Sequence, residues 1–495
     1  MSGAAFTAQD AQDTQALLRT AFDRLACTLL LLRVEQPATA RAWLRGLAGR
    51  LARVEQIGRD KPPVQDTLQL AFTAAGLRRL GGGPWVEQFA AEFTCAADGD
   101  ENRLRRLGDT GPNAPEHWQW GAAEREPHLL LMLFCAPQQL QQRTGELLAE
   151  AQAAGLAALE VLPAADLDGF EPFGFRDGLS QPELDWHGLR EPGGEADMDY
   201  QPRIALGEFL LGYRNEYGLH TERPLLDPAT PGATDLPLAV DRPGLRDLGR
   251  NGSYLVLRQL RQDVSGFWHW VRQNSEDQQQ ALELAEAMVG RHLDGEPFAG
   301  LQARPVPSGP SNDFTYAADR AGQVCPLGAH VRRANPRSGD FPRGRSGTLQ
   351  RWLAQLGLSG SAEEDHIASA RFHRLLRRGR EYGNAPYVAL DGQRATEETG
   401  LHFICLNASL GRQFEFVQSA WIASARFAGL SQEQDPLLGN RQPFPGTQPS
   451  DGFSRPEAAG PCRFSRGLPL FVQVHGGAYF FLPGLRALGW MLREP

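Results

Sequence analysis

Hydrophobic segments near the start of the chain alternate between the patterns of strands and helices. The continuous apolar run at 25–34 indicates a buried strand, and leucines at helical spacing follow it at Leu44, Leu47 and Leu51. Three further strand-like segments and one helical segment come next: strands at 67–72, 128–135 and 156–163, and a helix at 137–154. This β-α-β, β-α-β order predicts a ferredoxin-like α+β unit, in which helices cover one face of an antiparallel sheet.

A comparable set of segments follows in the rest of the chain. A helix is predicted at 276–294, and strands are predicted at 207–213, 253–260, 401–408 and 471–483. Long connections rich in proline and glycine separate these segments, as is common where loops carry a functional site on a sheet. No short sequence repeat is visible, so any duplication lies at the level of the fold.

Charge and cysteine content exclude several classes of protein. The 495 residues carry a net charge of −9, which gives no global attraction to nucleic acid or to an anionic membrane. The six cysteines are scattered without a CxxC pair, a pattern typical of free thiols in a reducing compartment and not of a zinc site. The N-terminus has no recognisable export signal, and the longest apolar run is too short to cross a bilayer. We therefore expect a soluble, cytoplasmic protein.

The segment "GFEPFGFRDGLSQPE" (169–183) places an acid where a charge is hard to solvate. Asp177 lies between Gly174 and Gly178, beside the aromatic rings of Phe173 and Phe175. Glycine lets a chain lie close against another surface, and aromatic rings exclude water. The alternative interpretation is an ordinary turn carboxylate that caps the backbone.

A histidine lies in the segment "CPLGAHVRRANPRSGD" (325–340). The small residues Gly328 and Ala329 before His330 leave room for a flat group to pack nearby. A neutral imidazole is a good iron ligand, and the arginines that follow suit carboxylates such as haem propionates. Read alone, however, an isolated histidine is more often a surface or core residue without a ligand.

Two later segments carry no function when read alone. "FHRLLRRGREYG" (372–383) has the periodicity of a helix that ends at Gly379, and a solvated basic face near a helix C-terminus explains its arginines. "GLHFICLNASLGRQFEFVQSAW" (400–421) is typical of a core strand, a turn and the start of an aromatic helix.

Taken together, ordered blocks of the sequence resemble the dye-decolourising (DyP-type) haem peroxidases. The blocks are "GFRDG", "CPLGAHVRRANPR", "LLRRGREYG", "GLHFICLNASLGRQFEF" and "FVQVHGGAYFFLPGL". The resemblance extends from about residue 65 to the C-terminus and is greatest to the longer, cytoplasmic subgroup. It implies two ferredoxin-like units, expected at 1–200 and 201–495, with one haem b per chain in the second.

The resemblance also implies roles for individual residues. His330 becomes the proximal iron ligand, Asp177 the distal acid/base and Arg377 the distal arginine. The remaining matched positions are Asn335 and Arg337 near a haem propionate, Leu401 and Phe403 on the distal side, and Gly174 and Phe175 in the loop of Asp177. The acidic partner of His330 is not assigned by the resemblance, and Glu415 is one hypothesis.

These roles imply a reaction with hydrogen peroxide that passes through an oxoferryl intermediate. Asp177 moves a proton between the two peroxide oxygens, and Arg377 stabilises the developing negative charge. Phe173 and Phe175 should raise the pKa of Asp177 by limiting water, in opposition to a lowering by Arg377. Because a helix turns adjacent side chains about 100° apart, Arg378 is expected to be a solvated or structural charge.

The expected partners are hydrogen peroxide and a small-molecule reducing substrate, which is bulky, dye-like or phenolic. Such a substrate is too large for a buried haem, so oxidation is expected through surface aromatic residues. The candidates are Trp186, Trp268, Trp270, Tyr382 and Trp421. No carboxylate cluster for manganese is apparent, and the sequence leaves a homo-oligomer open.

Two other hypotheses stay open at this point. A haem-binding protein for storage, sensing or iron release would use His330 but would not need Asp177 or Arg377. A haem-free ferredoxin-like dimer would bind a small acidic metabolite through the arginines at 332–337.

Overall fold

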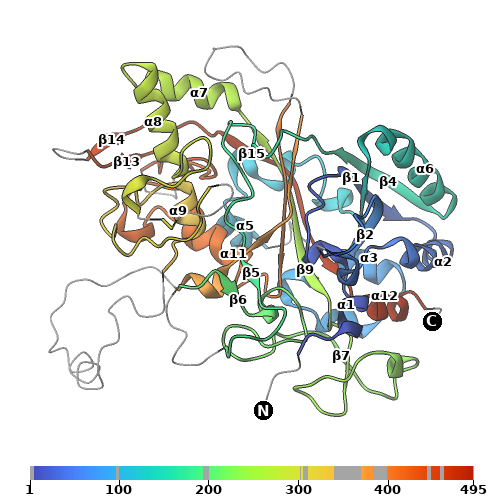
Figure 1. Ribbon diagram of the computed structural model, residues 1–495. Helices are drawn as coiled ribbons and strands as arrows, with labels where there is room; N and C mark the ends of the chain where they lie inside the picture. The colour runs from blue at the N-terminus through green and yellow to red at the C-terminus, as the bar shows by residue number, and fades with distance from the viewer. Residues whose placement is uncertain are drawn as a thin grey trace, which may run out of the picture.

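One antiparallel sheet runs through the centre of the molecule (Figure 1). The computed structural model describes residues 5–58, 60–95, 100–192, 200–301, 303–304, 310–338, 369–383, 398–442, 448–457 and 462–493. Within these residues the sheet has nine strands, and eight of them follow the order β10-β12-β9-β15-β2-β3-β1-β4. The ninth strand, β11, pairs with β12.

The N-terminal half contributes four strands and two covering helices. They are β1 (Ala26–Val34), α2 (Pro37–Leu47), β2 (Asp66–Phe72), β3 (Leu129–Cys135), α6 (Leu140–Ala153) and β4 (Leu156–Pro163). The middle of β1 is a run of four leucines at 29–32, and both faces of the strand are buried there. Leu30 and Leu32 pack with residues of α2 and α6, whereas Leu29 and Leu31 pack on the opposite face of the sheet. The predicted strands and helices of this half are confirmed.

The C-terminal half has the same strand order as the N-terminal half. Its elements are β9 (Ser253–Gln262), α7 (Val264–Gln273), α8 (Gln278–Val289), α9 (His330–Ala334), β10 (Leu376–Arg377), β11 (Arg380–Tyr382), β12 (Gly400–Asn407), α11 (Phe414–Phe416), a π-helical segment (Val417–Ile422), β15 (Val472–Leu482) and α12 (Leu485–Met491). In each half the sheet order is second, third, first and fourth strand, which is the ferredoxin-like arrangement. The predicted fold class is therefore confirmed. The boundary between units at residue 200 stays a prediction.

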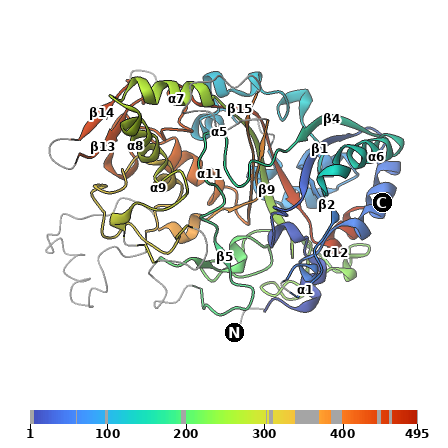
Figure 2. The same ribbon diagram turned by 45° about the horizontal axis from the view of Figure 1, so that its top comes forward.

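The two units share one sheet because β15 lies beside β2, where Phe481 pairs with Phe72. Figures 1 and 2 agree that α7, α8 and α9 lie at one end of the molecule, together with β13 (Phe453–Arg455) and β14 (Arg463–Ser465). The helices α2 and α6 lie at the other end. The helix α9, which begins at His330, therefore lies at the opposite end from α2 and α6 (Figure 1).

Two predicted elements are wrong. Residues 207–213 form no strand; the segment begins with a 3₁₀ turn (Leu206–Glu208) and continues as turns, with backbone bonds such as Leu210 N–H to Leu206 O at 2.9 Å. Its apolar run is explained by burial, since Phe209 and Leu210 pack against the sheet.

The predicted helix at 372–383 is replaced by the end of a 3₁₀ helix (Ala370–His373) followed by two short strands, β10 and β11. Leu376 pairs with Leu406 and Arg380 with His402, so β10 and β11 both extend the sheet beside β12. A Cβ atom at Gly379, between the two strands, would lie only 2.7 Å from the His402 carbonyl oxygen. Pairing with β12 overrides the helical periodicity of the sequence.

Candidate active site

The loop that carries Asp177 is a small hairpin closed by backbone hydrogen bonds. The Asp177 N–H donates to the Gly169 carbonyl at 3.0 Å, and the Glu171 N–H donates to the Phe175 carbonyl at 2.8 Å. Gly174 and Gly178 have φ values of +100° and +78°, which disfavour a side chain. The glycines on either side of Asp177 thus shape the hairpin.

Asp177 forms an ion pair with Arg377. Arg377 Nη1 lies 3.0 Å from Asp177 Oδ1. The Asp177 side chain is 36% exposed and the Arg377 side chain is 32% exposed. Arg377 lies on the edge strand β10, where its backbone N–H donates to Gln181 Oε1 at 3.0 Å. The structure therefore brings together the acid and the arginine, which are 200 residues apart in sequence.

The pKa of Asp177 is held below its usual value. Burial alone would raise this pKa, but the Arg377 charge, the Gly178 N–H and the hydrogen bond from Arg377 lower it more. Of the two opposing effects expected from the sequence, the lowering by Arg377 is the larger. Asp177 is consequently a carboxylate at neutral pH.

Arg378 is a half-buried structural charge held by backbone carbonyls. Adjacent residues of a strand face opposite sides, so the separation of Arg377 from Arg378 follows from strand geometry and not from a helix. Arg378 Nε donates to the Leu17 carbonyl at 2.7 Å, and Nη2 donates to the Leu18 carbonyl at 3.1 Å. Burial lowers the pKa of Arg378 to about 10.

His330 is the first residue of α9, and a buried carboxylate holds its ring. The His330 Nδ1 atom lies 2.9 Å from Asp435 Oδ2. The other carboxylate oxygen of Asp435 accepts the N–H groups of Leu437 and Leu438 at 2.9 and 2.8 Å. Burial alone would lower the pKa of His330, but the Asp435 charge raises it above the usual value. A ring held at Nδ1 in this way presents Nε2 to a ligand.

The hypothesis that Glu415 is the partner of His330 is wrong. The Glu415 carboxylate accepts from Arg103 Nε at 2.6 Å and from the Tyr479 hydroxyl at 3.1 Å. Asp435 was missed because it lies 105 residues from His330 in sequence. The sequence around it, Asp435-Pro436-Leu437-Leu438, is an ordinary turn pattern and does not indicate a partner for a histidine.

Among the contacts of the described residues, none joins the His330 side chain to Asp177 or Arg377. Their charges nevertheless act on one another: His330 lowers the pKa of Asp177, and Arg377 lowers the pKa of His330. The histidine and the acid–arginine pair are therefore within electrostatic range of each other without direct contact.

Two buried arginines lie beside this group. Arg337 and Arg374 are 2% and 4% exposed, and no carboxylate of the described residues lies within 4 Å of either guanidinium. Arg374 Nη1 donates to the Tyr200 hydroxyl at 3.0 Å, and the Asn335 side chain donates to the same hydroxyl at 3.1 Å. Arg337 Nη1 donates to the carbonyls of Asn312 and Phe314.

Each of these two arginines retains a buried donor without a partner. The unpaired atoms are Arg337 Nε and Arg374 Nη2. A buried cation without a counter-charge is costly, so the pair fits an anionic group held at this place. Arg374 was not singled out from the sequence, because its segment read as a solvated helix face.

The neighbouring arginines of α9 are already paired. Arg332 forms an ion pair with Asp319 at 2.9 Å, and Arg333 donates to the carbonyls of Gly328, Trp421, Ser424 and Glu433. Of the arginines at 332–337, only Arg337 has an unpaired donor. This disfavours the hypothesis of a metabolite site built from the whole cluster.

The apolar residues expected on the distal side share one cluster. Leu401 and Phe403 lie on β12, on the same face of the strand, and are half-buried. They pack with Phe173 and Phe175 of the Asp177 hairpin and with residues of α7 and α8. Gly174 lies between these two phenylalanines and is buried.

Taken together, these residues fit a haem. The site offers one imidazole with a free nitrogen, an acid paired with an arginine, an apolar cluster and two buried guanidinium groups with unpaired donors. Imidazole ligation and arginine contacts to carboxylates are what a haem requires of its protein.

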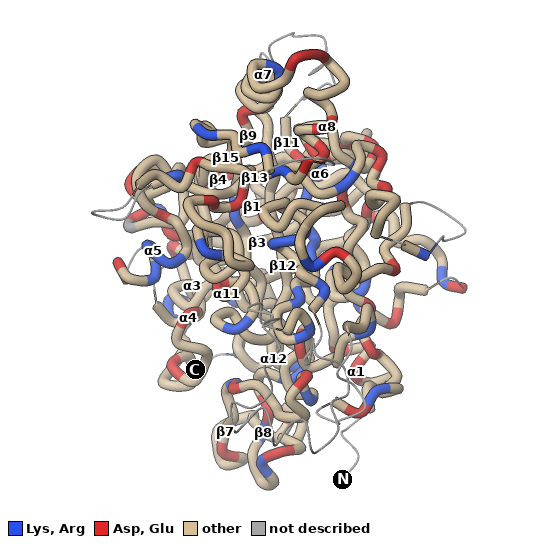
Figure 3. Tube along the Cα trace, turned by 90° about the vertical axis from the view of Figure 1, so that its left-hand side faces the viewer, with Lys and Arg blue, Asp and Glu red and all other residues tan. Residues whose placement is uncertain are grey.

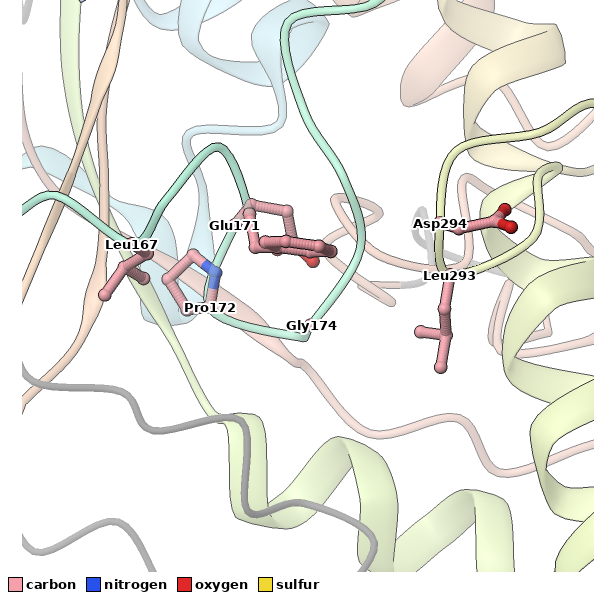
Figure 4. A pocket seen from close by; sticks show the side chains of 7 residues that line it. Leu167, Glu171, Pro172, Gly174, Leu293 and Asp294 are labelled. Atoms are coloured by element: carbon pink, nitrogen blue, oxygen red, sulfur yellow. The ribbon is translucent and has the colours of Figure 1, made fainter. Parts of the chain in front are cut away.

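A cavity of about 580 Å³ lies beside the Asp177 hairpin (Figure 4). It is lined by Leu167, Phe170, Glu171, Pro172, Gly174, Leu293 and Asp294. Figure 4 shows the hairpin residues on one wall and Leu293 and Asp294 on the other. Most of the lining is apolar, and its two acids are Glu171 and Asp294.

Most of the aromatic residues suggested for surface electron transfer are buried. Trp268, Trp270, Trp421 and Tyr382 are all less than one tenth exposed, whereas Trp186 is half-buried. Sequence reasoning missed Tyr217, which is 50% exposed and stacks on Phe372 at 4.1 Å.

In the backbone view of Figure 3, acidic and basic residues are interspersed along the described chain. Among the residues with described positions, no three His, Cys, Asp or Glu side chains form a metal-binding group. In that same part of the chain, no helix has the length and apolar character required to span a membrane.

Comparisons with known proteins agree on one family. No family model matches the chain. The multifunctional dye peroxidase DyP2 of Amycolatopsis sp. is 29% identical over 515 residues, covering 98% of this chain and 96% of that protein. The dye-decolorizing peroxidase AauDyP1 of Auricularia auricula-judae is 27% identical over 66% of this chain and 56% of its own length.

Solved structures show the same fold. The DyP-type peroxidase of Anabaena sp. superposes with a TM-score of 0.70 at 20% identity, covering 98% of this chain and 95% of that one. DyP2 from Amycolatopsis sp. superposes with a TM-score of 0.68 at 23% identity, covering 98% of each chain. In both sequence and fold, the chain is similar to the dye-decolourising (DyP-type) family of haem peroxidases.

Proposed function

We propose that the chain binds one haem b, reduces hydrogen peroxide and oxidises bulky organic substrates of the dye or phenol type. The observation that carries this proposal is the Asp177–Arg377 ion pair within electrostatic range of His330. The names of the relatives, which are dye peroxidases, support the substrate class.

Haem would be held from two directions. His330 would bind the iron through Nε2, since Asp435 occupies the Nδ1 side of the ring. Arg337 and Arg374 would bind the haem carboxylates through their unpaired donors, with Asn335 and Tyr200 fixing Arg374. When bound, haem supplies the electrons that break the O–O bond of the peroxide.

Asp177 would move the proton that this reaction requires. Its carboxylate, ionised at neutral pH, accepts a proton from one peroxide oxygen and returns it to the other. Arg377 orients Asp177 and stabilises negative charge that develops on the peroxide. Phe173 and Phe175, both buried, exclude water from the loop that carries the acid.

Leu401, Phe403, Gly174 and Phe175 would line the haem on its apolar side. A haem protein for storage, sensing or iron release would use His330 and the buried arginines equally well. It would leave the Asp177–Arg377 pair without a use, and the peroxidase is therefore the better supported function.

The absorption spectrum of the purified protein tests the proposal. A peroxidase should show a Soret band that changes within seconds of adding hydrogen peroxide, and Asp177→Asn should slow this change while leaving the band. A Soret band that peroxide leaves unaltered would favour storage or sensing, and the lack of any band would favour the haem-free hypothesis. The reducing substrate, the cytoplasmic location and the oligomeric state stay predictions.

A further inference from the structure

A second carboxylate organises the hairpin of Asp177 from within. The Glu171 carboxylate accepts the N–H groups of Phe173 and Phe175, both at 3.0 Å. It also accepts from Gln262 Nε2 on β9 at 2.8 Å. The side chain therefore closes the tip of the hairpin on itself and ties it to the sheet.

The hairpin is fixed at further points. Trp268 Nε1 of α7 donates to the Phe173 carbonyl at 3.0 Å, and the Arg176 N–H donates to the Leu293 carbonyl at 3.0 Å. Neither bond involves a titratable group. Of the three side chains that hold the tip of the hairpin through these bonds, Glu171, Gln262 and Trp268, only Glu171 is titratable.

Several charges face Glu171 from the elements around it. Asp177 on the same hairpin repels its charge, His330 of α9 lies within electrostatic range, and the exposed Arg176 covers the Phe170 ring. Asp294 lines the same cavity. Burial raises the pKa of Glu171 to about 7, although its three N–H donors favour the ionised form.

Gln262 allows both protonation states of Glu171. Its Oε1 atom is buried and has no hydrogen-bond donor. If the amide turns over, this oxygen can accept the O–H of a protonated Glu171, whereas in the observed orientation the amide N–H donates to the carboxylate. The cavity that Glu171 lines gives the exchanging proton access to water.

We propose that Glu171 is the positioning residue of Asp177 and that its gain or loss of a proton sets how firmly the hairpin presents Asp177 to Arg377. The inference rests on the proposed function, in which Asp177 carries the peroxide proton. The pKa of Glu171 is raised because its charge is poorly hydrated in the closed hairpin, so loss of the proton loosens the hairpin. As the pH rises through the pKa of Glu171, Phe173 and Phe175 should therefore become less protected.

Hydrogen exchange at 169–178 in the haem-loaded protein, measured from pH 5.5 to 8.5, tests the inference directly. In the wild type, protection relative to intrinsic exchange should fall as the pH rises through about 7. Glu171→Gln should exchange roughly fivefold faster for each lost hydrogen bond, without this pH dependence. Asp294→Asn is the matched control, because it removes the other acid of the cavity and should behave as wild type.

The pre-steady-state reaction with hydrogen peroxide provides the second readout. Glu171→Gln should lose the component of the rate profile near neutral pH, while Asp294→Asn should keep it. Gln262→Leu offers an independent variant: it removes a donor to the carboxylate, so the midpoint of loop protection should shift to higher pH.

Three results would overturn the inference. In the first, hydrogen exchange in Glu171→Gln keeps the wild-type protection and pH dependence. In the second, Glu171→Gln reacts with peroxide more slowly by the same factor at every pH. In the third, the pH midpoint of loop protection in Gln262→Leu is unshifted. The second result would show that Glu171 is only a structural acceptor. Failure of the proposed function is distinguishable, because Asp177→Asn would then react with peroxide at the wild-type rate whatever the exchange data show.

Discussion

At the scale of single residues, the pKa of Asp177 is raised by one feature of its surroundings and lowered by others. Burial disfavours its charge, whereas Arg377 and the Gly178 N–H favour it. The result is an acid that is ionised at neutral pH and can accept a proton from a peroxide. In the proposed mechanism Arg377 would serve two purposes, because the charge that would stabilise the peroxide also keeps its proton acceptor ionised.

Arg377→Leu should slow the reaction with peroxide about a hundred- to a thousandfold with haem still bound, as is common on loss of one preorganised donor. Stopped-flow absorption, normalised to haem content, measures this effect. Arg378→Leu is the control. It strands the Leu17 and Leu18 carbonyls and should lower the melting temperature, while the folded fraction reacts normally. Equal slowing in both variants would contradict the assignment.

The pH dependence of the same reaction should follow Asp177. Because its folded pKa lies below the usual value, the ion pair stabilises the fold above the unfolded pKa, and this contribution is lost as the pH falls through the folded pKa. The rate should fall at acidic pH as Asp177 is protonated. Arg377→Leu should move this acid limb to higher pH, and Asp177→Asn should abolish it. An acid limb that both variants leave in place would assign it to another group.

Asp435→Asn should make the axial imidazole a weaker electron donor, since the carboxylate that favours a proton on the ring is lost. The reduction potential of the bound haem should therefore rise, as a potentiometric titration would show. Glu415→Gln should leave the reduction potential unchanged, because Glu415 pairs with Arg103 and Tyr479.

His330→Ala should lose most of the haem, because the ring that would bind the iron is removed. A wild-type Soret band in that variant would exclude His330 as the ligand.

Local sequence context draws attention to Asp177 and His330, because glycines and other small residues surround them, whereas Arg377 is assigned only through the family resemblance. It could not identify Asp435 or Arg374. Their contacts to His330 and Tyr200 span 105 and 174 residues, and nothing in their own neighbourhood distinguishes them from a turn acid or a surface cation.

At the scale of elements, the segment that carries Arg377 shows where periodicity fails. Phe372, Leu375 and Leu376 have helical spacing, yet the segment pairs with β12, because an unpaired edge of the sheet is available there. The N-terminal strands were predictable, since an apolar run buried on both faces has no helical alternative of similar length. The 207–213 segment shows that the same kind of run can be buried without pairing.

Gly379→Ala should displace β10 from β12, because a Cβ atom would lie 2.7 Å from the His402 carbonyl. We expect a loss of stability of roughly 1–3 kcal/mol and slower reaction with peroxide, since Arg377 is two residues away. Gly145→Ala is the control: this helical glycine has open space around it, so stability should rise by up to about 1 kcal/mol. Thermal unfolding measures both, and an unaltered Gly379→Ala variant would contradict the close approach.

At the scale of the whole molecule, buried acids should make the fold less stable above neutral pH. Burial raises the pKa of Glu171, Glu208 and Glu381 to about 7. A raised folded pKa gives stability that is present below the unfolded pKa and is lost as the pH rises through the folded one. The melting temperature should therefore fall between pH 5.5 and 8.5. A melting temperature that rises over this interval, measured by calorimetry at constant ionic strength, would show that other groups dominate.

The position of β15 has a consequence for the order of biosynthesis. This strand lies in the middle of the sheet, between β9 and β2, yet it is the last strand of the described chain to leave the ribosome. Until residues 472–482 emerge, the nascent polypeptide exposes two open strand edges, which are sites of aggregation. The two halves therefore cannot join before residues 472–482 have emerged, and the interval before that is when a cell would need a chaperone for this chain.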